Sequence, residues 1–91
     1  MQTYIIVYDL IKERNSADYT KLINAIKSFE TWCHPTESTW LVQTKRTAQG
    51  IYDVLNPLMD ANDKLLITRA SADAKWKNLA LEVSEWLKKA L

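Results

Sequence analysis

The sequence predicts one α+β domain, a split β-α-β sandwich with an added C-terminal helix. Short segments rich in β-branched and aromatic residues alternate with segments in which apolar residues recur every three or four positions. The chain has 91 residues, a length at which one hydrophobic core is expected, so we treat residues 1–91 as a single domain. Hydrophobic residues make up 47% and charged residues 25%, which excludes a disordered tail, a collagen-like repeat and a low-complexity linker.

The first strand is expected over residues 3–10, a run too short for a globular helix and rich in strand-forming residues. Side chains of a strand point alternately to two faces. One face carries Ile5 and Val7, and the other carries Tyr4, Ile6 and Tyr8. Because both faces are apolar, this strand is expected in the middle of a sheet that is covered on both sides.

The first helix is predicted over about residues 17–29, with Asn15 or Ser16 as its N-cap. Apolar residues at helical spacing form a stripe along one side of it. The stripe consists of Tyr19, Leu22, Ile23, Ile26 and Phe29. This pattern is typical of an amphipathic helix that packs on a sheet.

Two further helices are expected. Thr47 is a candidate N-cap for the second, and Pro57 is expected to bend this helix or to end it near Asn56. The third is predicted over about residues 75–91, where Lys88 and Lys89 suit the negative end of the helix dipole. Its apolar stripe consists of Trp76, Leu79, Ala80, Val83, Leu87 and Leu91.

The remaining strands are predicted over residues 31–34, 38–44 and 64–69. Pro35 lacks a backbone N–H, so the strand beside it is expected at an edge, a bulge or a turn of the sheet. In the next strand Trp40 and Val42 share one face, while Leu41 lies on the other.

This order of elements describes a split β-α-β unit, with the first two helices on one face of a four-stranded antiparallel sheet. The other face then needs a cover, either the C-terminal helix or a second copy of the chain. A domain of this size gains from such burial, and we expect a homodimer that the third helix helps to stabilise.

Composition excludes several function classes. The formal net charge is +1, so no global basic field indicates nucleic acid, and Gly50 as the one glycine excludes the Gly-rich phosphate loops. The longest apolar run, residues 4–8, is far shorter than the ~20 residues of a membrane span, and no secretory signal is expected. One cysteine, Cys33, forms no internal disulfide, which favours the cytoplasm.

Two short motifs carry a resemblance to a known group. The segment Tyr-Ile-Ile-Val-Tyr-Asp-Leu, residues 4–10, is similar to the first strand of the smaller core CRISPR adaptation protein and of the VapD-like ribonucleases. The segment Glu-Ser-Thr-Trp-Leu, residues 37–41, resembles a set of small bacterial and phage proteins labelled "SinR family". In these proteins a Trp-x-His motif, here Trp32 and His34, precedes that segment, and Thr47-Ala48 begins a helix soon after it.

This resemblance implies a ferredoxin-like homodimer in which the first-strand aspartates of two subunits lie near the dimer axis and hold a divalent metal, Mg²⁺ or Mn²⁺. Asp9 is the matching position. The chain departs from the CRISPR proteins at its C-terminal end, where a helix is predicted instead of a further strand, and the flanking basic cluster is limited to Lys12 and Arg14.

Asp9, His34 and Ser38 are the candidate catalytic residues. A carboxylate at a strand end can bind a metal, or it can cap the following loop through backbone N–H groups. His34 and Ser38 are candidates for a base and a nucleophile, although their closeness along the chain favours a structural role for His34. Cys33 is expected to be a small buried apolar residue.

Tryptophans and basic pairs are candidates for nucleic-acid contact. Trp32 and Trp86 could stack on bases, whereas Trp40 and Trp76 are expected in the core or a dimer interface. The candidate phosphate-binding residues are Lys12, Arg14, Lys45 and Arg46.

Two functions follow as hypotheses. The first is a small homodimeric protein that acts on nucleic acid, a metal-dependent endonuclease of RNA or DNA with Asp9 as metal ligand. The second is a non-catalytic module: a toxin–antitoxin or phage and host defence component, or a binder of a small nucleotide.

Overall fold

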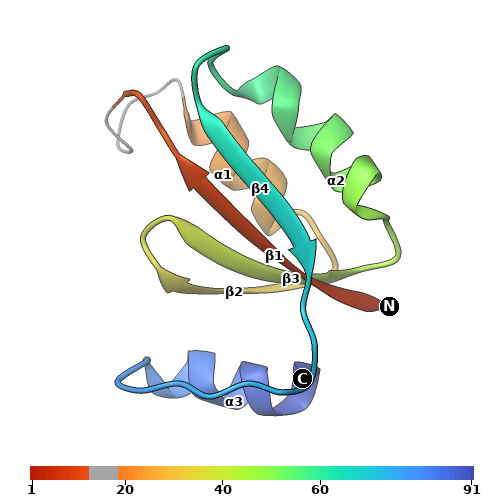
Figure 1. Cartoon of the computed structure of the whole chain (residues 1–91), viewed down its shortest axis with the longest axis vertical. Helices are drawn as coiled ribbons and strands as arrows, with labels where there is room; N and C mark the ends of the chain where they lie inside the picture. The colour runs from red at the N-terminus through yellow and green to blue at the C-terminus, as the bar shows by residue number, and fades with distance from the viewer. Residues whose placement is uncertain (13–18) are drawn as a thin grey trace.

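The computed structural model describes residues 1–12 and 19–91, and these residues form an α+β arrangement of one four-stranded antiparallel sheet and three α-helices (Figure 1). In chain order the elements are β1 (Gln2–Asp9), α1 (Thr20–Lys27), β2 (Thr31–Thr36), β3 (Thr39–Thr44), α2 (Ala48–Leu55), the short 3₁₀ helix η2 (Asn56–Leu58), β4 (Lys64–Arg69) and α3 (Leu81–Ala90).

The sheet has the strand order β2-β3-β1-β4, and every neighbouring pair is antiparallel. β1 is therefore a central strand, as its sequence predicts. Ile5 lies opposite Leu41 on one side and Thr68 on the other. β2 and β4 are the two edges.

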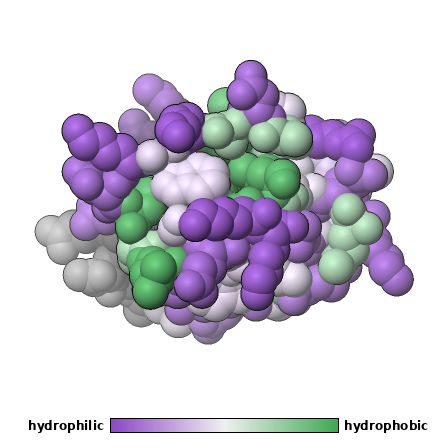
Figure 2. Space-filling model, turned by 90° about the horizontal axis from the view of Figure 1, so that it is seen from below, coloured by the Kyte–Doolittle hydropathy of each residue, from purple (hydrophilic) through white to green (hydrophobic). Residues whose placement is uncertain are grey.

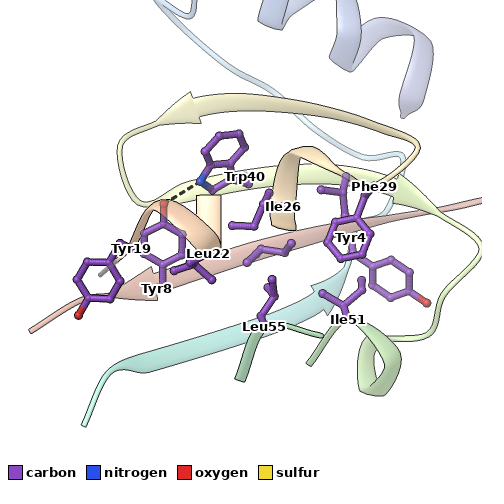
Figure 3. Close-up of a cluster of buried hydrophobic side chains, with 11 residues drawn as sticks. Tyr4, Tyr8, Tyr19, Leu22, Ile26, Phe29, Trp40, Ile51 and Leu55 are labelled. Atoms are coloured by element: carbon purple, nitrogen blue, oxygen red, sulfur yellow. Dashed lines mark hydrogen bonds between the residues drawn. The ribbon is translucent and has the colours of Figure 1, made fainter. Parts of the chain in front are cut away.

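Helices α1 and α2 pack on one face of the sheet, where they enclose the larger hydrophobic cluster (Figure 3). Its buried members are Tyr4, Ile6, Tyr8, Tyr19, Leu22, Ile26, Phe29, Trp40, Val42, Ile51 and Leu55. The alternation expected in β1 and β3 is confirmed, because the side chains assigned to one face of each strand all lie in this cluster. At about 25 cal/mol per Å² of apolar area, such burial is the main favourable term for the fold.

Helix α3 packs on the opposite face, below the sheet in Figure 1, around a second cluster built on Cys33, Leu41, Val83 and Leu87. The outer side of the molecule below α3 carries hydrophobic residues in small groups among hydrophilic ones (Figure 2). Of the two covers that the sequence left open for this face, the C-terminal helix is the one observed. β1, which is apolar on both faces, therefore does not need a second copy of the chain to cover its second face. The homodimer stays a prediction.

Helix α1 is shorter than its predicted apolar stripe. α1 spans Thr20–Lys27 and ends two residues before the predicted end near 29, yet the flanking Tyr19 and Phe29 are buried as expected. The N-cap predicted at Asn15 or Ser16 lies outside the described residues.

The predicted limits of α2 are confirmed at both ends. The Thr47 side chain accepts a hydrogen bond from the Gly50 N–H at 3.1 Å, and the α-helix gives way to η2 at Asn56, just before Pro57.

The C-terminal helix is the main departure from the sequence prediction, since it begins at Leu81 and not near residue 75. Asn78 has φ 60°, the left-handed region, which a continuous α-helix does not contain. Trp76 and Leu79 nevertheless pack against the second cluster, so the apolar spacing was correct as a burial pattern and wrong as a helix. In the described part of the chain, no helix combines the length and apolar character needed to cross a membrane.

The edge strand β2 contains Pro35 and shifts its register against β3 between Cys33 and Thr36. The prediction that Pro35 belongs at an edge or a bulge is confirmed. The strand continues two residues beyond the predicted end at His34, because an edge strand needs hydrogen bonds on one side only.

Candidate functional site

A cavity of about 910 Å³ lies at the end of the sheet where β1 ends and the β2–β3 turn begins. We call it the β1 groove. Its polar lining comes from segments far apart in the sequence: Asp9, Lys12, Lys27, His34, Glu37 and Ser38. Four of these residues, Asp9, Lys12, His34 and Ser38, are candidates that the sequence singled out separately, and the fold gathers them in one place.

One wall of the groove is aromatic. Trp40, buried to 1% exposure, donates its indole N–H to the Tyr8 hydroxyl at 2.8 Å (Figure 3). The His34 ring stacks on Trp40, with ring centroids 3.7 Å apart and an interplanar angle of 11°. Tyr8 and Trp40 belong to the larger hydrophobic cluster and also line the groove, so the wall of the groove is part of the core.

His34 is held by backbone as well as by stacking. Its Nε2 lies 3.2 Å from the Glu37 carbonyl oxygen, which only accepts hydrogen bonds, so Nε2 carries the proton. Ser38 is positioned by its own backbone, whose carbonyl accepts from the Tyr8 N–H at 3.1 Å. In this tautomer Nδ1 is the ring nitrogen that can accept a proton, and no described hydrogen bond joins it to Ser38.

Asp9 is exposed at the last position of β1, opposite Lys64 of β4, and it lines the groove. Among residues 1–12 and 19–91 no group of three His, Cys, Asp or Glu side chains is placed to hold a metal ion. A closed protein cage for a metal is therefore not formed by these residues. Mg²⁺ is also bound through one or two carboxylates with water and substrate phosphate completing the shell, and Asp9 fits that arrangement.

Asp63, in the loop before β4, anchors the segment that follows β1. Its carboxylate accepts from the Ile11 N–H at 2.8 Å, the Asp60 N–H at 2.8 Å and the Tyr19 hydroxyl at 2.9 Å. Desolvation alone would raise the pKa of Asp63, but these hydrogen bonds and Lys12 outweigh it and hold the pKa below its usual value. Burial and the bond to Asp63 raise the pKa of Tyr19.

Through these bonds Asp63 fixes one rim of the groove. The Lys12 N–H donates to the Tyr19 hydroxyl at 3.4 Å, and Lys12 Nζ lies 4.0 Å from Asp60. Asp63 is 52 residues away from its partner Ile11, so no local sequence pattern could have revealed the contact.

Lys27 lines another side of the groove, and Trp32 lies next to Lys27, outside the lining itself. The Lys27 ammonium lies 5.5 Å from the Trp32 ring centroid, a cation–π distance, and Trp32 is 38% exposed. Trp32 also packs against Trp40, with centroids 5.4 Å apart. Lys27 was not singled out from the sequence, because a lysine on the polar side of a helix carries no signal of its own.

Lys45 and Arg46 do not join the groove. Lys45 and Arg46 follow the end of β3 that lies beside Gln2, whereas Asp9 ends β1 at the opposite end of the sheet. The Lys45 N–H donates to Glu30 at 3.1 Å, and the bonds from Thr44 and Lys45 lower the pKa of Glu30. Arg14 lies outside the described residues.

The other two tryptophans and the cysteine are packing residues. Trp76 donates to Ser84 at 3.0 Å and Trp86 to Thr31 at 2.7 Å, both beside the second cluster. Cys33 is buried as expected, and burial raises the pKa of its thiol to about 11, which leaves little reactive thiolate at neutral pH.

Comparisons of the chain with protein-family models, with curated proteins and with solved structures gave no match.

Proposed function

We propose that this protein is a ferredoxin-like domain with an added C-terminal helix, and that it binds nucleic acid in the β1 groove. The strand order, with β3 between β1 and β2 and all neighbours antiparallel, supports the fold assignment. The observation that carries the functional proposal is the convergence of acidic, basic and aromatic side chains from β1, α1 and the β2–β3 hairpin on one cavity.

The chemistry of the rims suits a polyanion with aromatic bases. Lys12 and Lys27 supply ammonium groups for phosphate oxygens. Next to the groove, beside Lys27, Trp32 offers a partly exposed ring on which a base can stack, a contact worth about 1–3 kcal/mol per base. The cytoplasm is the compartment we propose, because Cys33 is unpaired and buried.

We further propose that Asp9 holds Mg²⁺ or Mn²⁺ together with water and a substrate phosphate. When bound, such an ion would polarise the phosphodiester and lower the pKa of an attacking water. Lys12 and Lys27 would orient the backbone of the nucleic acid, and the stacked His34 and Trp40 would keep the wall of the groove rigid.

The test of catalysis is cleavage of RNA and DNA in Mg²⁺ and in Mn²⁺ by the wild-type chain and by Asp9→Asn. The proposal expects metal-dependent cleavage that drops by at least ~100-fold in Asp9→Asn while the circular dichroism spectrum stays the same, since loss of one essential catalytic group costs factors of this order. Asp73→Asn, an exposed carboxylate after β4, is the matched control and should cleave as the wild type does. Cleavage that survives in Asp9→Asn would rule out the catalytic role.

A second function, binding without cleavage, is favoured by one observation: among the described contacts no hydrogen bond joins His34 to Ser38, so these two residues do not form a base–nucleophile pair there. Such a module would still bind nucleic acid with an affinity that falls steeply as salt rises. Binding that ignores salt, or no binding, would instead support a protein partner or a small nucleotide as the ligand.

A further inference from the structure

The two edges of the sheet differ sharply in how they are protected. β2 carries Pro35 and a register shift, devices that natural sheets use to stop further strands from adding. β4, over Lys64–Arg69, pairs regularly with β1 along its whole length and contains no proline, glycine or bulge. Its outer side pairs with no other strand in the described part of the chain.

The hydrogen bonds of β1 show which groups of β4 face outward. The Ala70 N–H donates to the Thr3 carbonyl at 2.9 Å, so Ala70 and, by the alternation of an antiparallel ladder, Thr68 and Leu66 turn their backbone groups toward β1. The N–H and C=O groups of Leu65 and Ile67 therefore point to the free edge.

Apolar surface flanks this edge on both sides. Leu66, on the α3 side, is 58% exposed, and Tyr52, on α2 at the other side, is 43% exposed. A second cavity of about 300 Å³ lies along the edge between α2 and β4, lined by Ala48, Gln49, Tyr52, Leu65, Leu66 and Ile67. A strand added to β4 would cover this surface and satisfy the outward backbone groups at once.

We propose that the β4 edge binds the β4 edge of a second copy of this chain, so that two sheets join across a two-fold axis at Leu66. This gives an interface to the homodimer that the sequence predicts, and it is independent of the chemistry of the groove. A two-fold interface must be self-complementary, and β4 meets that requirement in one register.

In that register Leu66 faces Leu66 of the second copy, and Leu65 faces Ile67, whose outward backbone groups then pair directly. Lys64 faces Thr68, and Arg69 comes opposite Asp63, whose carboxylate also accepts from Ile11, Asp60 and Tyr19, so this register sets no charge against an apolar side chain. A shift by two residues in either direction places Arg69 opposite Leu65 or Asp63 opposite Ile67, a charge against an apolar side chain. A shift by one residue would set outward backbone groups against inward ones.

The arrangement also has a consequence for the groove. Asp9 pairs with Lys64, two residues from the axis and one strand further out, so the two Asp9 side chains would lie about 20 Å apart. Each protomer would then hold its own metal site, and the shared site expected near a dimer axis would not form in this dimer.

The first experiment measures the molar mass of the full chain by light scattering and by sedimentation. The proposal expects twice the chain mass for the wild type and the single-chain mass for Leu66→Lys, which sets two ammonium groups against each other at the axis. Leu81→Lys, at an equally apolar and 72% exposed position on α3, is the control and should stay dimeric. A wild type that is monomeric at every concentration, or a Leu66→Lys variant that stays dimeric, overturns the proposal.

A second experiment tests the register, and it decides the matter if Leu66→Lys fails to fold. Residues facing each other at the axis have Cα atoms about 4.5 Å apart, within reach of a disulfide. Leu66→Cys should therefore form a covalent dimer under mild oxidation. Thr68→Cys should not, because its copies would lie about 14 Å apart.

The wild type, with Cys33 buried, is the blank for the cross-linking. Equal cross-linking by both variants, or by neither, contradicts the register. A monomer that instead takes up an added extended apolar peptide at this edge would assign β4 to a foreign partner and overturn the proposal of a second copy. Asp9→Asn should remain dimeric, which separates a failure here from a failure of the proposed catalysis.

Discussion

At the scale of single residues, the hydrogen bond between Trp40 and Tyr8 joins the core to the β1 groove. The indole N–H is fully buried, and the Tyr8 hydroxyl at 2.8 Å is its acceptor. A buried donor that loses its partner pays its full desolvation cost, so Tyr8→Phe is expected to lower the free energy of unfolding by about 1–3 kcal/mol. Urea denaturation checks this value. Tyr52→Phe, at a 43% exposed position, is the control and should change stability by less than about 0.5 kcal/mol.

Asp63 stabilises the fold through the hydrogen bonds that its carboxylate accepts from Ile11, Asp60 and Tyr19. Its pKa is lowered in the folded state, so the stability it contributes is present above the usual carboxyl pKa of about 3.9 and is lost as the pH falls through the lowered folded value. Near neutral pH, Asp63→Asn is expected to cost about 1–3 kcal/mol, because its amide cannot accept all of these bonds. The difference from the wild type should shrink in acid.

Unfolding curves recorded from neutral pH down through the carboxyl range test this dependence. Asp73→Asn, at an exposed position, provides the matched comparison and should follow the wild type throughout. A difference between Asp63→Asn and the wild type that does not depend on pH would contradict the assignment of the charge.

At the scale of elements, the turn at Asn78 explains why the apolar pattern before α3 is not helical. The left-handed conformation costs an ordinary L-residue about 1–2 kcal/mol and costs glycine almost nothing. Asn78→Ala is therefore expected to destabilise the protein by about 1 kcal/mol, whereas Asn78→Gly should be neutral or slightly stabilising. Thermal unfolding of the two variants makes the comparison. Equal losses in both would show that the Asn78 side chain, and not its backbone, matters.

Helix α3 covers the sheet face opposite to the one that α1 and α2 cover. Leu87 is 5% exposed in the second cluster, so Leu87→Ala is expected to cost about 2–5 kcal/mol. Leu81→Ala, at 72% exposure on the same helix, should cost less than about 0.5 kcal/mol. Denaturation of both variants tests whether α3 is an integral part of the fold. A small loss in Leu87→Ala would mean that α3 is only weakly attached.

Sequence patterns predicted the elements well where the periodicity and the packing direction agree. β1, β3, β4 and the Thr47 cap follow from alternation and capping chemistry, and residues 64–69 form the predicted strand without change. The segment around Trp76 and Leu79 could not be assigned in the same way. Side chains three residues apart can be buried by an irregular segment as well as by a helix, and the backbone separates the two, with Asn78 left-handed and Ala80 at ψ 149°.

At the scale of the whole molecule, the fold decides which candidates share a site. Asp9, His34 and Ser38 meet because β1 and β3 are antiparallel neighbours, which brings the end of β1 next to the turn before β3. Strand pairing joins segments that are far apart in the sequence. It could be predicted only from the order of the strands and helices. The same pairing sends Lys45 and Arg46 to the far end of the sheet.

The basic residues lie at two opposite ends of the sheet, Lys12 at one and Lys45 and Arg46 at the other. β1 has eight residues, so Lys12 and the pair Lys45 and Arg46 lie roughly 20 Å or more apart along the sheet. If nucleic acid binds in the β1 groove, Lys12→Ala and Lys27→Ala should each weaken binding and reduce the slope of log affinity against log salt by about 1, the value for one lost phosphate contact. The double variant Lys45→Ala with Arg46→Ala removes more charge, yet it should leave the slope unchanged. Fluorescence anisotropy with a labelled single-stranded RNA over a range of salt concentrations measures all four chains. A larger slope change in the double variant than in Lys12→Ala would move the binding surface to the opposite end of the sheet.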